Sequence, residues 1–295
     1  MSASPKVQAS LWMLGASVAF ALMAVAVKLA AQHGVPLAQT LFYRGVISVA
    51  MMAIYMRFAG VEYRTPHWRA HFQRGSAGFL GMIAYFGGIT LLPLAAAVTL
   101  NYTSPLFLAS MLLIRHRERP PPSMVVAMGA GFVGILLLLR PTYHSSQWLG
   151  VSLALASAVT AAIAALNIRS LGRLDEPISR TVAYFAFFTT VGSLPWYLTT
   201  DLTAIDAAGI ACVVAVGVLA TLGQVLLTLA YQRGHTLLVS LLGYSQVIFT
   251  TLIGMALWQD HPGAGSWLAI ALIVASGAAA TIFTRASQQK RAQDT

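Results

Sequence analysis

Two polar runs inside long apolar stretches have the residue types and spacing to bind a small polar molecule. One reads Asn101-Tyr102-Thr103-Ser104-Pro105, and the other reads Tyr244-Ser245-Gln246. Proline has no backbone N–H and clashes with the carbonyl four residues earlier, so Pro105 frees the carbonyl of Asn101. Irregular backbone at membrane depth is tolerated where it lines a cavity or is buried in protein. Hydrogen bonding between helices, worth about 1 kcal/mol per contact, is the alternative role for these side chains. We predict a binding cavity that is lined by Asn101, Tyr102, Ser104, Tyr244 and Gln246.

Arg44 is a cation placed within an apolar stretch. It lies about 12 Å from the end of that stretch at 1.5 Å per residue, and a guanidinium suits a bidentate contact with a carboxylate. We predict that Arg44 binds an anionic group of a ligand; the alternative is that it binds backbone carbonyls or extends toward the surface. Lys28 is nearer to the end of its stretch and is expected to extend to the surface. Weaker candidates for the same cavity are Tyr85, Gln224, Ser17, Phe20 and Thr160.

Catalysis would need a nucleophile–base pair or metal ligands at depth, and the sequence predicts no acid or histidine there. All eight Asp and Glu residues and all seven His residues fall in connections, tails or helix ends. No H-E-x-x-H, C-x-x-C or Walker sequence is present, and the G-x-G-x-x-G match at 129–134 lies in an apolar stretch without a preceding strand. We therefore expect no enzyme, no cofactor and no metal site. The same pattern predicts no strong coupling to protons or Na⁺, with a proton relay through His235 as the alternative.

The elements that position these residues are predicted to be membrane-spanning helices. Hydrophobic residues make up 58% of the 295 residues and charged residues only 9%, against roughly 25% charged in soluble domains. A spanning helix needs about 20 apolar residues. The fold class is therefore all-α integral membrane, and ten spans are predicted at 9–31, 37–56, 76–92, 94–114, 123–139, 148–168, 181–199, 207–230, 236–258 and 265–284.

The basic residues are distributed unevenly over the connections. Of 18 Lys and Arg, two lie within predicted spans, and only Arg140 lies on the side opposite to the N-terminus, which leaves 15 on the N-terminal side. Positive charge gathers on the cytoplasmic side of membrane proteins. Both termini are therefore predicted to be cytoplasmic. The net charge of +10 is expected to meet anionic lipid headgroups rather than nucleic acid.

The second half of the chain repeats the first. Residues 100–107 align with 242–249 at an offset of 142, and the same offset places Glu118 on Asp260 and Pro120 on Pro262. Both acids are expected to cap the helix that follows. Five spans per half is an odd number, so the halves, 1–141 and 142–295, are predicted to be inverted in the membrane. Pro105 and Gly243 fall at near-equivalent positions and are predicted hinges.

These residues carry a resemblance to the drug/metabolite transporter (DMT) superfamily, specifically its EamA-type ten-helix members. The matching features, spread over about residues 10–284, are Lys28, Phe42-Tyr43-Arg44, Tyr102 to Phe107, the acid–proline pairs, and Gly131 and Gly134 before Arg140-Pro141. The resemblance implies two inverted five-helix bundles around a central cavity, with the fifth and tenth helices at the periphery. It also implies transport of small metabolites, often the export of amino acids or related compounds.

Inverted repeats are typical of secondary transporters that work by alternating access. We therefore expect a multi-pass transporter of the inner (plasma) membrane. The resemblance implies that it exports its cargo, for which we expect amino acids or related zwitterionic or anionic metabolites. Uptake of a metabolite of similar size is the alternative, and an intramembrane enzyme or a receptor is a remote one. The expected partners are a small-molecule substrate and the lipid bilayer, without nucleic acid. The sequence leaves the oligomeric state open, a monomer included.

Overall fold

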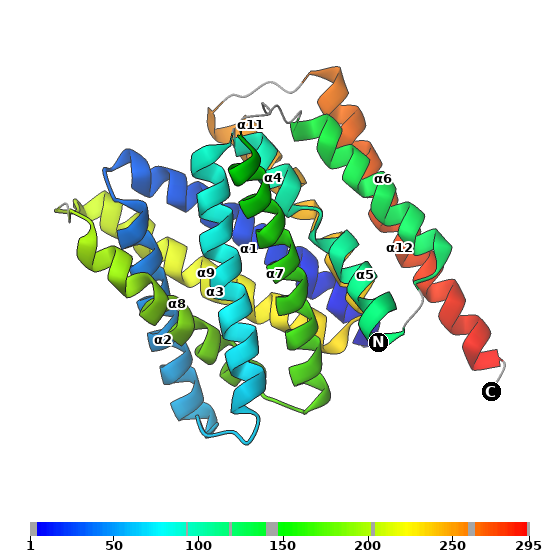
Figure 1. Ribbon diagram of the computed structural model, residues 1–295, viewed down its shortest axis with the longest axis horizontal. Helices are drawn as coiled ribbons and strands as arrows, with labels where there is room; N and C mark the ends of the chain where they lie inside the picture. The colour runs from blue at the N-terminus through cyan, green and yellow to red at the C-terminus, as the bar shows by residue number, and fades with distance from the viewer. Residues whose placement is uncertain are drawn as a thin grey trace.

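The computed structural model describes residues 5–92, 94–117, 120–139, 147–201, 204–258 and 263–293, and it confirms the all-helical fold within these ranges (Figure 1). The chain forms helices α1 (Pro5–Gln32), α2 (Leu37–Ala59), α3 (Trp68–Leu91), α4 (Leu94–Asn101), α5 (Ser104–His116), α6 (Pro122–Leu139), α7 (Trp148–Arg173), α8 (Ile178–Thr199), α9 (Ala207–Arg233), α10 (Thr236–Leu242), α11 (Ser245–Trp258) and α12 (Ala264–Gln293). Helices α4 and α5 divide one predicted span between them, and α10 and α11 divide another.

Six stretches of the described chain are long and apolar enough to cross a membrane by length and composition: Val7–Gln32, Leu37–Ala59, Ala97–Ile114, Trp148–Arg173, Ala207–Arg233 and Thr236–Leu257. Helices α6 and α12 contain shorter apolar stretches, Pro122–Leu138 and Ala264–Ala280. Helix α3 begins at Trp68 and not near residue 76 as predicted. Its first turns carry Arg69, His71 and Arg74, so hydropathy alone places its start too late.

The main helix packing runs between the two halves of the chain and not within them. Helix α1 packs most extensively on α9, and α3 packs to a similar extent on α7, which is the equivalent pair when the halves are exchanged. Helix α2 packs on its counterpart α8, and α6 packs on its counterpart α12. This pattern has the two-fold symmetry expected of a duplicated five-span unit, and the seam between the halves runs through the middle of the bundle.

Helices α6 and α12 lie together at one edge of the bundle (Figure 1). A Cβ atom at Gly134 would lie 2.7 Å from Cγ1 of Ile273 and 3.0 Å from the carbonyl oxygen of Ala269, so only glycine permits this approach. Gly131 is held equally close, against Ser276 and Tyr244. Close helix packing therefore accounts for Gly131 and Gly134 of the 129–134 match, whereas a Cβ atom at Gly129 would meet nothing within 4 Å.

Both chain ends lie on the same side of the bundle (Figure 1). Consecutive spans alternate in direction, so the connections after α2, α7 and α9 lie on that side as well. These connections and the adjoining helix ends carry Arg57, Arg64, Arg69, Arg173, Arg180 and Arg233. We call this side the basic face.

A buried hydrogen-bond network joins the halves near the basic face. Glu176, in the connection between α7 and α8, is 5% exposed. Its Oε2 accepts hydrogen bonds from Arg180 Nη1 at 2.8 Å and His71 Nε2 at 3.2 Å, and its Oε1 accepts one from the hydroxyl of Thr65. The network therefore ties the start of α3 to the second half.

A related contact joins the halves at the opposite face. His33 Nδ1, after α1, lies 3.1 Å from Oδ2 of Asp206, whose Oδ1 caps α9 by accepting the Gly209 N–H at 2.7 Å. Both groups of this pair are exposed, at 38% and 59%, so the pair contributes little to stability.

We predict that Glu176→Gln lowers stability at neutral pH by about 3 kcal/mol, because it leaves Arg180 and His71 without their anionic partner. Burial alone would raise the pKa of Glu176, but hydrogen bonds from Thr65, Arg180 and His71 outweigh burial and hold this pKa below its ordinary value. A carboxyl group whose pKa is lower in the folded than in the unfolded protein stabilises the fold at pH values above its unfolded-state pKa. This stabilisation is lost as the pH falls through its folded-state pKa.

The measurement is the melting temperature of both proteins in detergent between pH 7 and pH 3. The difference in melting temperature between wild type and Glu176→Gln should be largest at neutral pH and should decrease below about pH 4. Asp206→Asn, at the exposed pair, is the matched control and should lower the melting temperature less. A gap that stays constant over the whole range would contradict the role of the carboxylate charge.

Candidate functional site

Two spans are broken near their middle, at equivalent places in the two halves. Helix α4 ends at Asn101 and α5 begins at Ser104; helix α10 ends at Leu242 and α11 begins at Ser245. Pro105 lies in the first turn of α5, where its missing N–H is tolerated. Gly243 has ordinary right-handed helical dihedral angles, φ −58° and ψ −25°. A Cβ atom there would lie 3.0 Å from Met13 Cε, so the glycine provides space and not an unusual conformation. That these breaks move as hinges stays a prediction.

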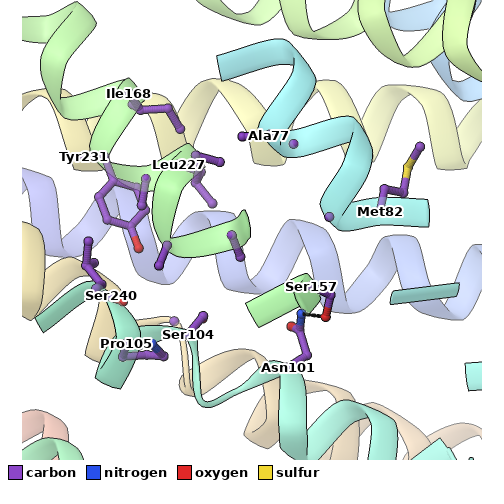
Figure 2. Close-up of a pocket in the computed structure, with 18 of the residues that line it drawn as sticks. Ala77, Met82, Asn101, Ser104, Pro105, Ser157, Ile168, Leu227, Tyr231 and Ser240 are labelled. Carbon is purple, nitrogen blue, oxygen red and sulfur yellow. Dashed lines mark hydrogen bonds between the residues drawn. The ribbon is translucent and has the colours of Figure 1, made fainter. Parts of the chain in front are cut away.

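The two breaks meet in space. The rings of Tyr102 and Tyr244, which are equivalent residues of the repeat, pack edge to face with centroids 5.9 Å apart and planes at 78°. The amide of Asn101 donates a hydrogen bond of 2.8 Å to the hydroxyl of Ser157 on α7 (Figure 2). The alternative considered for this polar run, hydrogen bonding between helices, is therefore present at Asn101 alongside its place at the cavity.

A cavity of about 330 Å³ lies between the halves, beside both breaks (Figure 2). It is lined by parts of α1, α2, α3, α7, α8, α9 and the two broken spans. The structure brings ten of the binding and hinge residues predicted from sequence to its walls, namely Arg44, Tyr85, Asn101, Tyr102, Ser104, Pro105, Gln224, Gly243, Tyr244 and Gln246. That these residues bind a substrate remains a prediction, whereas their location around one cavity is an observation.

The cavity extends from the middle of the bundle toward the basic face. Ile168 lies near the basic-face end of α7, Tyr231 near that end of α9, and Ser240 on α10; Figure 2 shows these three together at one end of the cavity. A second cavity of about 180 Å³ lies beyond them, lined by Leu112, Pro120, Pro121, Arg169, Gly234, His235, Thr236 and Leu237.

An apolar layer lies between the two cavities. Leu108, Ile168 and Tyr231 line the first cavity, and Leu112 and Leu237 line the second. All five belong to one buried hydrophobic cluster. Opening this layer would connect the central cavity to the basic face.

Arg74 was not predicted from the sequence as a cavity residue. The structure places it inside α3 with 4% of its surface exposed, on the wall of the cavity. Its guanidinium carbon lies 4.2 Å from the centroid of the Phe185 ring, and its Nη2 donates to Oε1 of Gln224 at 3.2 Å. Nε and Nη1 have no hydrogen-bond partner in the part of the chain that the structure describes. The regular spacing of Gly75, Gly78 and Gly81 is typical of one face of a helix. This spacing was the feature of the sequence that could have indicated that the helix includes Arg74.

Arg44 lies on the same cavity. Its Nη1 is 3.7 Å from the thioether sulfur of Met82, which is a weak acceptor. Among the residues that the structure describes, the cavity lining includes these two arginines and no Asp or Glu. The site therefore presents two guanidinium groups without a carboxylate on its walls.

Three weaker candidates do not line the cavity and were wrongly assigned. The Thr160 hydroxyl donates to the carbonyl of Ala156 at 2.8 Å, and the ring of Phe20 fills the space beside Gly223. Ser17 is fully buried. The apolar periodicity of α1 and α7 does not indicate which buried face meets the cavity.

Other predicted positions are simpler to place. Lys28 is exposed, as expected, and His235 lines the second cavity. Glu118, Arg140 and Asp260 lie outside the described residues. Within those residues, no group of three His, Cys, Asp or Glu side chains has the arrangement to hold a metal ion.

Comparisons with known proteins match this architecture. The model of the EamA-like transporter family matches residues 7–140 and 148–282. The pseudopaline exporter CntI of Pseudomonas aeruginosa is 29% identical over 249 residues, covering 84% of this chain and 87% of that protein. A riboflavin transporter of Rhizobium johnstonii is 26% identical over 292 residues, covering 98% and 94%. A solved crystal structure at 23% identity has the same fold, with a TM-score of 0.85 over 95% of this chain and 98% of that one.

The charge of the cavity predicts a selectivity for thiol reagents. Cys212→Ser removes the single cysteine of the chain, and Ser104→Cys then places one thiol on the cavity wall. The anionic reagent sulfonatoethyl methanethiosulfonate should react there at least about tenfold faster than the cationic aminoethyl analogue, because a site of one sign concentrates the opposite ion.

The matched control is Gln32→Cys, at the exposed end of helix α1 and away from the cavity. It should show no preference between the two reagents. Rates are followed by mass spectrometry of the purified protein. Equal rates at Ser104→Cys, or a faster cationic reagent, would contradict an electropositive cavity.

Proposed function

Because the chain belongs to the EamA-like transporter family, we propose that it exports amino acids or related zwitterionic or anionic metabolites by alternating access. At the coarser level the chain is a multi-pass membrane transporter of small metabolites and not an enzyme, as its family and its transporter relatives indicate. The observation that carries the proposal is the central cavity, which lies at the seam between the halves and beside both broken spans.

Alternating access requires a substrate site that the two halves share. The extensive contacts of α1 with α9 and of α3 with α7 cross the seam, so rocking one half against the other alters both sides of the cavity. The breaks at residues 102–103 and 243–244 interrupt two of the lining helices, where bending costs few backbone hydrogen bonds. Substrate would bind between the breaks and reach the basic face through the apolar layer at Leu108 and Leu237.

The direction and the membrane follow from the charge pattern and from family resemblance. Basic connections favour placing the basic face in the cytoplasm, in the inner (plasma) membrane. The central cavity extends from the middle of the bundle toward that face, and this position suits the loading of a cytoplasmic cargo for export. Uptake of a metabolite of similar size is the alternative direction.

The side chains at the cavity have distinct proposed roles. Arg44 binds a carboxylate of the cargo, and Gln224 and Gln246 offer amide donors and acceptors. Tyr85, Tyr102 and Tyr244 form an aromatic wall, from which the hydroxyl of Tyr244 has no hydrogen-bond partner in the described structure. A cavity of this size and lining is within the range of sites for small metabolites.

A counterflow screen of purified protein in liposomes, with amino acids, sugars and nucleotides as cargo, tests the proposal. Asn101→Ala and Tyr244→Ala should each lower the initial flux of the best cargo by about tenfold, the equivalent of about 1.4 kcal/mol of lost binding. Ser110→Ala, away from the cavity on α5, is the matched control and should transport normally. If both cavity variants transport like the wild type while all proteins are inserted equally, the cavity is not the substrate site.

The absence of acids from the cavity wall predicts weak coupling to protons. Imposing a gradient of one pH unit across the liposome should change the initial flux less than about twofold, because no lining carboxylate is available to bind and release a proton. The measurement compares zwitterionic cargo with and without the gradient at constant membrane potential. Uphill accumulation driven by the pH gradient would contradict this prediction.

A further inference from the structure

The cavity wall carries two arginines, Arg44 and Arg74, and a cargo with one negative charge would balance only one of them. They come from consecutive spans, α2 and α3, and share surroundings: Phe185 and Gln224 contact Arg74 and also line a small recess with Arg44. The two guanidinium groups therefore lie on the same part of the cavity wall.

Charges at this depth are costly without compensation. None of the acids in the part of the chain that the structure describes belongs to the cavity lining. Glu176 is committed to Arg180 and His71, and Asp206 lies at the opposite face beside His33. The protein therefore places two positive charges at one site without a carboxylate of its own to balance them.

Arg74 is held in a fixed position that leaves binding capacity free. The ring of Phe185 covers its guanidinium, and the amide of Gln224 accepts one of its hydrogen bonds. A Cβ atom at position 78 would lie 2.4 Å from Nη1, so Gly78 leaves the space that the guanidinium occupies. Nε and Nη1 remain without partners in the described chain. A buried, ordered and half-paired guanidinium is prepared to bind an anion.

We propose that the cargo is a small dicarboxylate, amino dicarboxylates included, whose two carboxylates bind Arg44 and Arg74 together. The proposal rests on the transporter function and specifies its substrate class. A dicarboxylate neutralises both guanidinium groups, whereas a monocarboxylate of the same size and shape neutralises only one. Charge balance at the site therefore selects diacids over the amides that lack one of the two carboxylates.

The test compares isosteric pairs that differ in one charge. Glutamate is paired with glutamine, aspartate with asparagine, and succinate with succinamate, and each is measured as cargo in the same liposomes. The diacid of at least one pair should move at least about tenfold faster than its amide. Arg74→Gln and, separately, Arg44→Gln should each reduce that ratio below about threefold, mainly by slowing the diacid.

Arg69→Gln is the matched control, because Arg69 is an exposed arginine on the same helix α3 and does not line the cavity. It should keep the full preference for the diacid. Gly78→Ala retains both charges but displaces the guanidinium of Arg74, and it should also reduce the preference. Size-exclusion profiles establish that each variant is folded.

The outcomes separate the two levels of the proposal. Amides or monocarboxylic amino acids that move as fast as the diacids, or a preference unchanged in both arginine variants, would overturn the dicarboxylate site and leave the transporter function standing. No flux of either set, together with no flux in the wider counterflow screen, would overturn both.

Discussion

The bilayer interior cannot hydrogen-bond to protein, and this constraint governs the arrangement of the polar groups at membrane depth. Two interrupted spans and two buried guanidinium groups would each be costly against lipid. The structure gathers them around one cavity at the seam of the bundle. The apolar helices α6 and α12, which have no such group, pack on each other at its edge. Polar groups at membrane depth therefore lie where hydrogen-bond partners are available to them.

The packing between halves gives this cavity its capacity for change. Because the largest helix contacts cross the seam, neither half is a closed unit with the site on its surface. The Glu176 network near the basic face and the His33–Asp206 pair at the other face bridge the same seam from its two ends. The cavity lies between these bridges, with an apolar layer on the basic side. A rigid-body rotation about the seam would therefore keep these bridging contacts and open the apolar layer.

Sequence patterns predict the spans and the breaks well, because hydropathy and proline act locally. The residues at the cavity were also predictable, since polar side chains in apolar spans have few other places to go. Arg74 was missed because His71 and Gln73 precede it, so hydropathy read the first turns of α3 as a connection. The burial of Glu176 was missed because its partners, Thr65 and His71, are over 100 positions away in the chain. Ser17, Phe20 and Thr160 were wrongly assigned because helical periodicity shows that a face is buried and does not show against what.

The duplication divides the site into symmetric and asymmetric parts. The breaks occur in both halves at equivalent positions, and their tyrosines, Tyr102 and Tyr244, touch. The cations do not follow this symmetry. The counterparts of α2 and α3 are α8 and α9, whose basic residues are Arg180 in the first turn and Arg233 at the end. Under the proposed alternating access, backbone features that serve movement recur in both halves, because each half would perform the same motion in the opposite sense. Recognition needs a charge on only one wall of the shared cavity, so selectivity is free to differ between family members that keep the same fold.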